Sequence, residues 1–320
     1  MGKENRSWKH PLLSTGRPLE RSVVECVQAI PELRPIGEYS FESLNSRGVL
    51  AEHSVDLLAR HSDVANDVGV DLLLESKYRH PGTKRVYRRA VPFTPEGPSL
   101  VGAFASTEDL VSGVFFDQLA TRKHDYAFSF GFSPIEVVGS NGKVLPDCDD
   151  GGRQLVSAAA ARLADAAIET LRTGVLRFVV PIAVTTCDLQ VFREEPSIER
   201  VQAAKSLDEL TERVEMIVCR HPVRDLEGQI HRRLASECAA SERLRLDSAL
   251  ASRGIEGLSG LARILARRLD GTYVVVRYED LAERLERAIR FCCAGVRYKA
   301  NVRSIRMPSA TISRSLAAGE

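Results

Sequence analysis

The stretch VDLLLESKYRHPGTKRVYRR, residues 70–89, joins an apolar run to two charged side chains and a basic segment. Residues 70–74 are apolar except for Asp71. Such an apolar run is typical of a strand that is buried on both faces. Glu75 and Lys77 follow with one residue between them. Residues two apart on a strand point to the same side, about 6.6 Å apart along the chain. The spacing therefore predicts a carboxylate and an amine that project together from the end of a buried strand.

A second strand is expected directly before this one. The segment SVDLLA, residues 54–59, reads as extended, and the segment RHSDVANDVG that follows it contains Asn-Asp and a glycine, which favour a turn. The pattern predicts an antiparallel hairpin, whose strands lie about 4.8 Å apart. Asp56 then lies on the strand beside Glu75, on the face opposite to Val55 and Leu57.

Two carboxylates and a lysine in this arrangement need partners, and a divalent cation is one candidate. Burying an unpaired carboxylate or ammonium is costly, and Mg²⁺ accepts few protein carboxylates together with several waters. Lys77 could orient or deprotonate a water, or stabilise developing negative charge. Asp71 is about 13 Å along the strand from Glu75, so geometry favours Asp56 as the second ligand. The alternative is a same-face ion pair between Glu75 and Lys77 on an exposed strand end, which would contribute little.

Two helices are expected beside this hairpin. Pro18 suits the first turn of a helix over residues 18–30, whose apolar residues recur at helical spacing. The alanine-rich segment 154–171 predicts a second helix, which leads into an apolar, β-branched strand at 178–184 that breaks at 185–188. A helix followed by a strand suggests a crossover that returns the chain to the same sheet.

The remaining segments are assigned from composition and spacing. Residues 81–100, which contain four prolines, and residues 140–152 are expected to be loops, and residues 106–121 a helix. Beyond residue 196 the sequence predicts a strand at 214–220, a broken helical region at 226–270, and a strand followed by a helix at 272–291.

Asp56 in SVDLLA and Glu75-Ser76-Lys77 in VDLLLESKYR together resemble the motif of the PD-(D/E)XK nuclease superfamily, which has the restriction-endonuclease-like fold. The order of helix, hairpin, helix and strand over roughly residues 18–192 is similar to the core of that fold. The resemblance implies phosphodiester hydrolysis, with Mg²⁺ or Mn²⁺ held by Asp56 and Glu75 and water activated near Lys77. It also implies that Glu20, at the start of the first helix, reaches the metal. The alternative for Glu20 is the ordinary preference of acidic residues for helix N-termini.

The sequence differs from the family pattern at two points. Val55 stands where the family's name places a proline, and there is no convincing further glutamine motif, since Gln118 and Gln154 both offer a glutamine and neither is compelling.

A basic run follows the motif, with tyrosine and histidine residues interleaved. We expect its members to contact the phosphates of a nucleic acid beside the scissile bond. The alternative is a solvated hairpin surface. The predicted contact residues are Arg79, Lys84, Arg85, Arg88 and Arg89.

Composition limits the classes of protein to consider. The chain has 320 residues, 44% of them hydrophobic, and a net charge of +1, so a core of ordinary size is expected and any positive patch must be local. Seven cysteines without C-x-x-C spacing, an N-terminus without an apolar signal segment, and the lack of any stretch long enough to span a membrane predict a cytoplasmic protein that makes no membrane contact.

The predicted fold is α/β, with a mixed central sheet flanked by helices: a restriction-endonuclease-like core with a C-terminal α/β extension. The predicted regions are a flexible arm (1–17), a nuclease-like core (18–196), an accessory α/β region (197–296) and a basic, disordered tail (297–320).

The predicted function is that of a Mg²⁺-dependent deoxyribonuclease, with Asp56, Glu75, Lys77 and Glu20 as its catalytic residues. DNA is the expected partner. A homodimer, or a protein partner that supplies specificity, would be compatible with this function. The alternative is a non-catalytic module of the same fold that binds nucleic acid or a protein partner, for example in a defence complex. DNA versus RNA and endo versus exo cleavage stay open.

Overall fold

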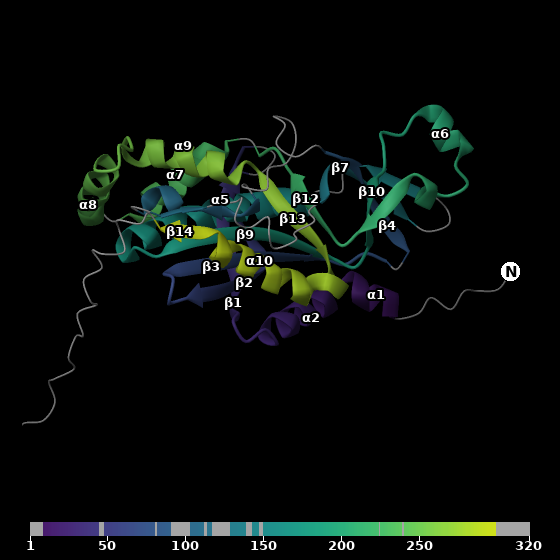
Figure 1. The fold of residues 1–320 in the computed structure, drawn as a ribbon, viewed down its shortest axis with the longest axis horizontal. Coiled ribbons are helices and arrows are strands. Elements are labelled where there is room, and N and C mark those ends of the chain that lie inside the picture. The colour runs from purple at the N-terminus through teal and green to yellow at the C-terminus, as the bar shows by residue number, and fades with distance from the viewer. Residues whose placement is uncertain are drawn as a thin grey trace, which may run out of the picture.

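The computed structural model of the protein describes residues 9–44, 48–80, 82–90, 103–111, 114–116, 129–138, 143–146, 150–223, 225–238 and 240–298. It has an α/β fold in which helices flank a large mixed sheet (Figure 1), as the sequence predicts.

The strands are β1 (Arg34–Leu44), β2 (Leu50–Asp63), β3 (Val68–Lys77), β4 (Thr83–Arg89), β5 (Ala105–Ser106), β6 (Val114–Phe116), β7 (Ser129–Val138), β8 (Lys143–Pro146), β9 (Leu176–Thr185), β10 (Asp188–Phe192), β11 (Thr211–Val214), β12 (Met216–Arg220), β13 (Thr272–Arg277) and β14 (Val296–Tyr298). The helices are α1 (Lys9–Ser14), α2 (Arg17–Gln28), α5 (Asp150–Thr173), α6 (Ile198–Ala203), α7 (Leu226–Glu237), α8 (Ala240–Ala251), α9 (Gly257–Leu269) and α10 (Leu281–Gly295). Short 3₁₀ turns lie at Glu108–Leu110, Leu207–Glu209 and Tyr278–Asp280.

The main sheet has the strand order β1-β2-β3-β9-β13-β12-β7-β4-β10-β11, with β5 beside β9 and β8 beside β7. Strands β6 and β14 form a separate antiparallel pair. The predicted hairpin is confirmed, because β2 and β3 are antiparallel. The predicted crossover is also confirmed, because α5 returns the chain to β9, which runs parallel to β3.

Two long chain segments run side by side through the sheet. Strand β3 is parallel to β9 up to the pair Lys77 and Thr185, and β4 is parallel to β10 from the pair Lys84 and Asp188. Only a short connection separates the two strands on each segment. The basic segment after Lys77 therefore continues along the sheet beside the continuation of β9.

For three segments the predicted secondary structure is wrong within the residues that the structure describes. Residues 81–100 are not all loop, because β4 forms between Pro81 and Pro92 from the β-branched and aromatic segment TKRVYRR. The expected helix at 106–121 is replaced, within the described residues, by β5, a 3₁₀ turn and β6. The expected loop at 140–152 contains β8 and the first turn of α5, since KVLP pairs with β7.

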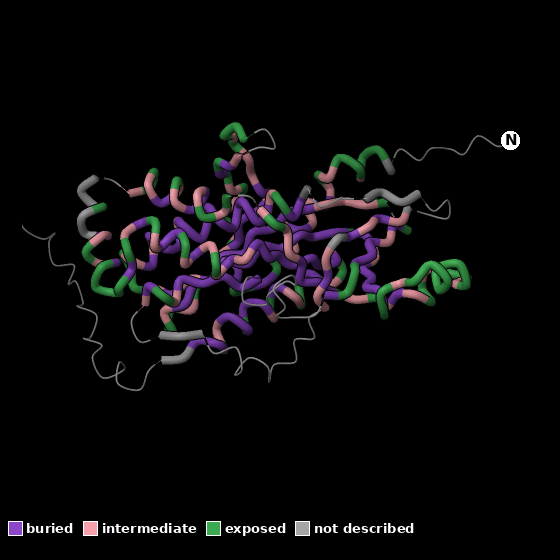
Figure 2. Tube along the Cα trace, turned by 90° about the horizontal axis from the view of Figure 1, so that it is seen from above, coloured by how far each residue is buried: buried purple, intermediate pink, exposed green. Residues whose placement is uncertain are grey.

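Helices cover both faces of the sheet (Figure 1). Helices α5, α7 and α9 share one apolar cluster with one face of the strands, and α2 and α10 share another cluster with the opposite face. The central strands are buried almost throughout, as the continuous purple core of Figure 2 shows. Helix α5 buries a run of alanines whose small side chains let it lie close to the sheet.

The sheet includes strands from both of the larger predicted regions. Strands β12 and β13 come from the predicted accessory region, yet they lie between β9 and β7. Within the predicted arm, Lys9–Ser14 form helix α1. Most of the predicted tail, residues 299–320, lies outside the described residues, as do residues 1–8. In the part of the chain that is described, no helix has both the length and the apolar character needed to cross a membrane.

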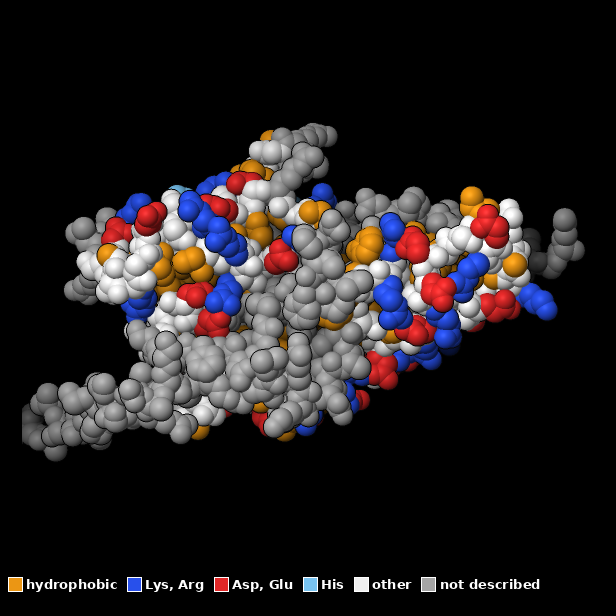
Figure 3. Space-filling view, turned by 45° about the horizontal axis from the view of Figure 1, so that its top comes forward, with side chains coloured by type: hydrophobic (Ala, Val, Ile, Leu, Met, Phe, Trp, Pro, Cys, Tyr) orange, Lys and Arg blue, Asp and Glu red, His pale blue; other side chains and the backbone are white. Residues whose placement is uncertain are grey.

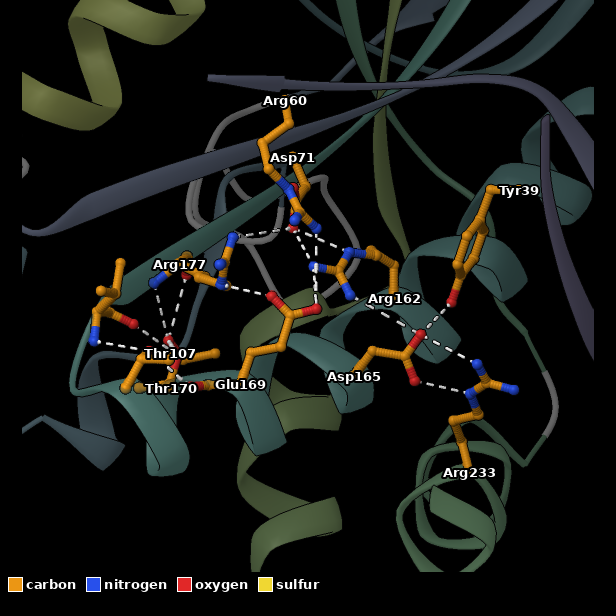
Figure 4. A network of polar contacts seen from close by, with 12 residues as sticks. Tyr39, Arg60, Asp71, Thr107, Arg162, Asp165, Glu169, Thr170, Arg177 and Arg233 are labelled. Carbon is orange, nitrogen blue, oxygen red and sulfur yellow. Dashed lines mark hydrogen bonds and ion pairs between the residues drawn. The ribbon is translucent and has the colours of Figure 1, made fainter. Parts of the chain in front are cut away.

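An ion network fixes α5 on the sheet (Figure 4). Asp71 of β3 is fully buried, and its carboxylate lies 2.7 Å from Arg60 Nε of β2 and 2.6 Å from Arg162 Nη2 of α5. Glu169, further along α5, lies 2.9 Å from Arg162 and 2.8 Å from Arg177 of β9. Figure 4 shows the three arginines pointing toward the two carboxylates. One helix and three neighbouring strands are therefore held together by charge.

The same helix carries a second group of polar contacts. Asp165 accepts a hydrogen bond of 2.8 Å from the Tyr39 hydroxyl of β1 and two from the Arg233 guanidinium of α7, at 2.7 and 3.1 Å. Burial and the Asp165 charge raise the pKa of Tyr39, so the phenol stays protonated and acts as a donor. These contacts fix the position of α5 relative to the edge strand and to the next helix.

We predict that Asp71→Asn lowers the free energy of unfolding by about 3 kcal/mol, because it removes the buried negative charge that Arg60 and Arg162 share and leaves the arginines of the network facing Glu169. The measurement is urea unfolding at pH 7. Arg21→Ala is the control, because it removes the exposed Arg21–Glu25 pair and should change stability by less than about 0.5 kcal/mol. A loss for Asp71→Asn that is as small as in the control would contradict a structural role for the network.

Candidate active site

Asp56 and Glu75 lie on adjacent strands, as the sequence predicts. The β2–β3 register pairs Leu57 with Leu74, so Asp56 and Glu75 are opposite each other one step beyond this pair. The backbone N–H of Asp56 donates to Glu75 Oε2 at 3.3 Å, and the backbone N–H of Ser76 donates to Asp56 Oδ2 at 2.6 Å. Each carboxylate is therefore positioned by the backbone of the other strand.

The alternation predicted for SVDLLA is wrong in one detail. Val55 packs in the cluster under α5, whereas Leu57 packs in the cluster under α2 and α10, so the two residues do not share a face. The register between β1 and β2 shifts on both sides of Gly37, which has φ +128°. A bulge of this kind changes which side chains face each layer.

Lys77 projects to the same side as Glu75, as predicted. Its Nζ lies 2.6 Å from Glu75 Oε1. Glu75 is buried, whereas the Lys77 side chain keeps 33% of its surface exposed. A Cβ at Gly151 would lie 3.1 Å from Lys77 Cε, so glycine lets the N-terminus of α5 lie against the lysine. The amine is thus held between a buried carboxylate and the start of a helix, with access to solvent.

The carboxylates of this site repel one another. Burial raises the pKa of Glu75, and the charge of Asp56 raises it further, whereas Lys77 lowers it. Burial likewise raises the pKa of Asp56, against the lowering effects of the Ser76 N–H and Lys77. In both carboxyl groups the unfavourable contributions are larger. The site therefore holds negative charge that its single lysine does not fully compensate.

Glu20 lies in the first turn of α2, as predicted. Burial raises its pKa, the charge of Asp56 adds to this effect, and Arg17 and Lys77 oppose it. The structure therefore brings Glu20 within electrostatic range of Asp56 and Lys77.

Sequence reasoning missed Glu38. This residue of β1 raises the pKa of both Asp56 and Glu20. It lies in the extended segment GEYSF, so a search of the next strand for carboxylates could have found it. Among the two glutamine candidates, Gln154 of α5 donates its side-chain amide to the backbone oxygen of Ser54. Gln118 lies outside the described residues.

Within the described ranges, no group of three or more His, Cys, Asp or Glu side chains is placed to hold a metal ion. The predicted three-carboxylate set of Asp56, Glu75 and Glu20 is therefore not assembled around one point. The pair Asp56 and Glu75 is the part of the set that the strand register brings together.

The predicted nucleic-acid contacts of the basic run are mostly occupied by carboxylates. The guanidinium of Arg85 is buried and lies 5.5 Å from the centre of the Tyr87 ring. Blue and red side chains alternate over the right-hand part of the face in Figure 3, where β4, β10 and α6 lie in Figure 1. Phosphate binding on this run would have to replace existing ion pairs. These pairs are Arg79–Glu136 at 2.8 Å, Lys84–Asp208 at 2.6 Å, Arg88–Glu195 at 2.9 Å, and Arg89–Glu212.

Two threonines at the end of β9 hold the backbone that follows Glu75. Thr185 Oγ1 donates to the Lys77 carbonyl at 3.1 Å. Thr186 Oγ1 accepts from the Arg79 N–H and donates to the Arg79 carbonyl, both at 2.8 Å. These contacts keep the β3 and β9 segments together beyond the last regular pair.

The chain matches no protein-family model, no curated protein and no solved structure.

We predict that Asp56→Asn raises the melting temperature at pH 7 by about 1 to 3 °C. The folded-state pKa of Asp56 is higher than its usual value of 3.8, so the carboxylate destabilises the fold once pH rises through the folded-state pKa. The difference from wild type should disappear as pH falls toward about 3.8. Thermal unfolding between pH 4 and 8 measures this. A variant that is less stable than wild type at pH 7 would contradict the assignment.

Proposed function

We propose that the protein is a metal-dependent phosphodiesterase that acts on DNA, with Asp56, Glu75 and Lys77 as its centre. The observation that carries the proposal is the contact set between the middle of β2 and the C-terminal end of β3: two carboxylates fixed by the backbone of the opposite strand, and an amine 2.6 Å from one of them. Raised carboxyl pKa values are typical of functional sites, where burial and neighbouring like charges shift the pKa of catalytic groups.

The donor chemistry of this pair fits Mg²⁺ or Mn²⁺. Such ions are bound through one or two carboxylates and complete their shell with water. Asp56 and Glu75 would hold the ion, and its positive charge would stabilise both carboxylates in their charged form, against the burial and the neighbouring negative charges that raise their pKa values. When bound, the ion would supply Lewis acidity and a more acidic water. Glu20 and Glu38 would add to the negative potential that attracts it.

Lys77 supplies the complementary charge. Its ammonium is fixed by Glu75 and by the start of α5, and it keeps an exposed fraction that a substrate could reach. A fixed ammonium stabilises negative charge that develops on a phosphate oxygen, without reorganisation at the moment of reaction. The PD-(D/E)XK resemblance is compatible with the order α2, β1, β2, β3, α5 and β9, and under this proposal residues 18–196 would be a restriction-endonuclease-like core.

A second candidate function is a non-catalytic module of this fold that binds a protein or nucleic acid. The occupied ion pairs of the basic run favour the protein-binding form of this module, since binding of nucleic acid needs cations for phosphates and four of these cations have carboxylate partners. Under this alternative, substitution of Glu75 or Lys77 would leave binding unchanged.

We predict that the wild-type protein nicks supercoiled plasmid with Mg²⁺ or Mn²⁺ and not with EDTA. Glu75→Gln and Lys77→Ala should each lower the cleavage rate by at least about 100-fold, because each removes a charge needed near the phosphate. Glu25→Gln and Lys205→Ala, both at exposed positions, are the matched controls and should cleave as wild type does. Salt-sensitive DNA binding without cleavage by the wild type would favour the non-catalytic module.

A further inference from the structure

A pocket of about 560 Å³ lies among β12, α7, α9 and the turn that leads into β13. Its size is in the range of small-molecule sites. The elements that form it differ from those that carry Asp56 and Glu75. Its apolar lining comes from Pro222, Val223, Leu226 and Ala266.

The backbone at one side of this pocket is rigid. Gly271 has φ +65°, and a Cβ there would lie 2.6 Å from the carbonyl oxygen of His221. The His221 N–H donates to the Gly271 carbonyl at 2.8 Å, which holds the segment after β12 against the turn before β13. Arg220, the last residue of β12, is fixed against this turn, because its guanidinium donates to the Asp270 side chain at 2.8 Å and to the Asp270 carbonyl at 3.2 Å. A charged group is thereby oriented at the pocket before any ligand binds.

Two further arginines come from one face of α9. Arg263 and Arg267 are four residues apart, which places them on adjacent turns of the helix. Arg263 lies 3.8 Å from Glu227 of α7, a long contact between exposed side chains. Arg267 is exposed and, among the described residues, makes no ion pair.

The charges that line the pocket do not cancel. Three arginines face two carboxylates, Glu227 and Asp270, so one positive charge remains. In Figure 3 Lys and Arg side chains gather on the left-hand part of the face, beside apolar side chains, where the helical layer lies in Figure 1. The pocket therefore combines an uncompensated arginine with an apolar wall.

We propose that this pocket binds a nucleotide unit, with its phosphate on Arg267 and Arg263 and its sugar and base against the apolar wall. Arginine binds phosphate through two parallel hydrogen bonds, and one residual positive charge matches the single charge of a phosphodiester. A nucleic-acid strand and a free nucleotide offer the same chemistry. The proposal does not rest on hydrolysis at Asp56 and Glu75, and it places phosphate binding away from the neutralised basic run.

The test is fluorescence anisotropy of labelled oligothymidylate with the full-length protein in EDTA. Arg267→Ala should weaken binding by at least about tenfold. Ala266→Leu keeps every charge but fills the pocket, and should weaken binding as well. Arg21→Ala also removes an exposed arginine, on α2, which covers the opposite face of the sheet, and should bind as wild type does. Matching unfolding curves would show that the variants are folded.

Binding that is unchanged in Arg267→Ala, or equally weakened in Arg21→Ala, would overturn the proposal, because only general surface charge would then matter. An Ala266→Leu protein that binds as wild type does would overturn the pocket as the location. Cleavage is not measured, so failure here is distinct from failure of the proposed hydrolysis.

Competition separates the two sources of the ligand. Thymidine monophosphate should displace the labelled strand, whereas thymidine and inorganic phosphate should not at equal concentration. Direct calorimetric binding of thymidine monophosphate without any strand binding would identify the free nucleotide as the ligand. Displacement by inorganic phosphate as strong as by the nucleotide would overturn recognition of a nucleotide, because the pocket would then select only an anion.

Discussion

The buried ion pair between Asp71 and Arg162 is the contact on which the arrangement of the candidate active site depends. Asp71 lies on β3, the same strand as Glu75 and Lys77, and on the same face. Its ion pair with Arg162 fixes α5 along that strand. The N-terminus of α5 then lies against Lys77 through Gly151, and Gln154 contacts the strand that carries Asp56. A buried ion pair is costly unless its charges are compensated, and here Arg60, Arg177 and Glu169 place further ion pairs around it.

One strand thus carries two carboxylates with opposite surroundings. Asp71 is surrounded by arginines, so its charge is compensated inside the fold. Glu75 has Lys77 on one side but Asp56 on the other, and burial together with the Asp56 charge raises its pKa. Compensated charge stabilises a fold, whereas charge held against repulsion is available for a cation or a substrate. This contrast is the physical reason to assign function to the end of β3 and structure to its middle.

Local pattern was enough to predict the hairpin, the same-side placement of Glu75 and Lys77, and the helix α5 that returns the chain to the sheet. Each of these depends on neighbours in sequence, through strand alternation, turn residues or helix propensity. The ion partners of Asp71 could not be predicted, because Arg162 and Arg177 are about a hundred residues away and meet it only after the sheet forms. The same limit applies to the basic run: its carboxylate partners at Glu195, Asp208 and Glu212 come from a distant segment. Strand β4 was missed because its flanking prolines outweighed its own β-branched and aromatic residues.

The most direct test of the account is a Mn²⁺ titration followed by electron paramagnetic resonance, which counts bound ions without requiring activity. The account predicts saturable binding to the wild type, and affinity at least about tenfold weaker in both Asp56→Asn and Glu75→Gln. Glu25→Gln, an exposed carboxylate on α2, should bind Mn²⁺ as the wild type does. Equal Mn²⁺ affinity in all four proteins would contradict the assignment of Asp56 and Glu75 as metal ligands, and with it the proposal of metal-dependent hydrolysis.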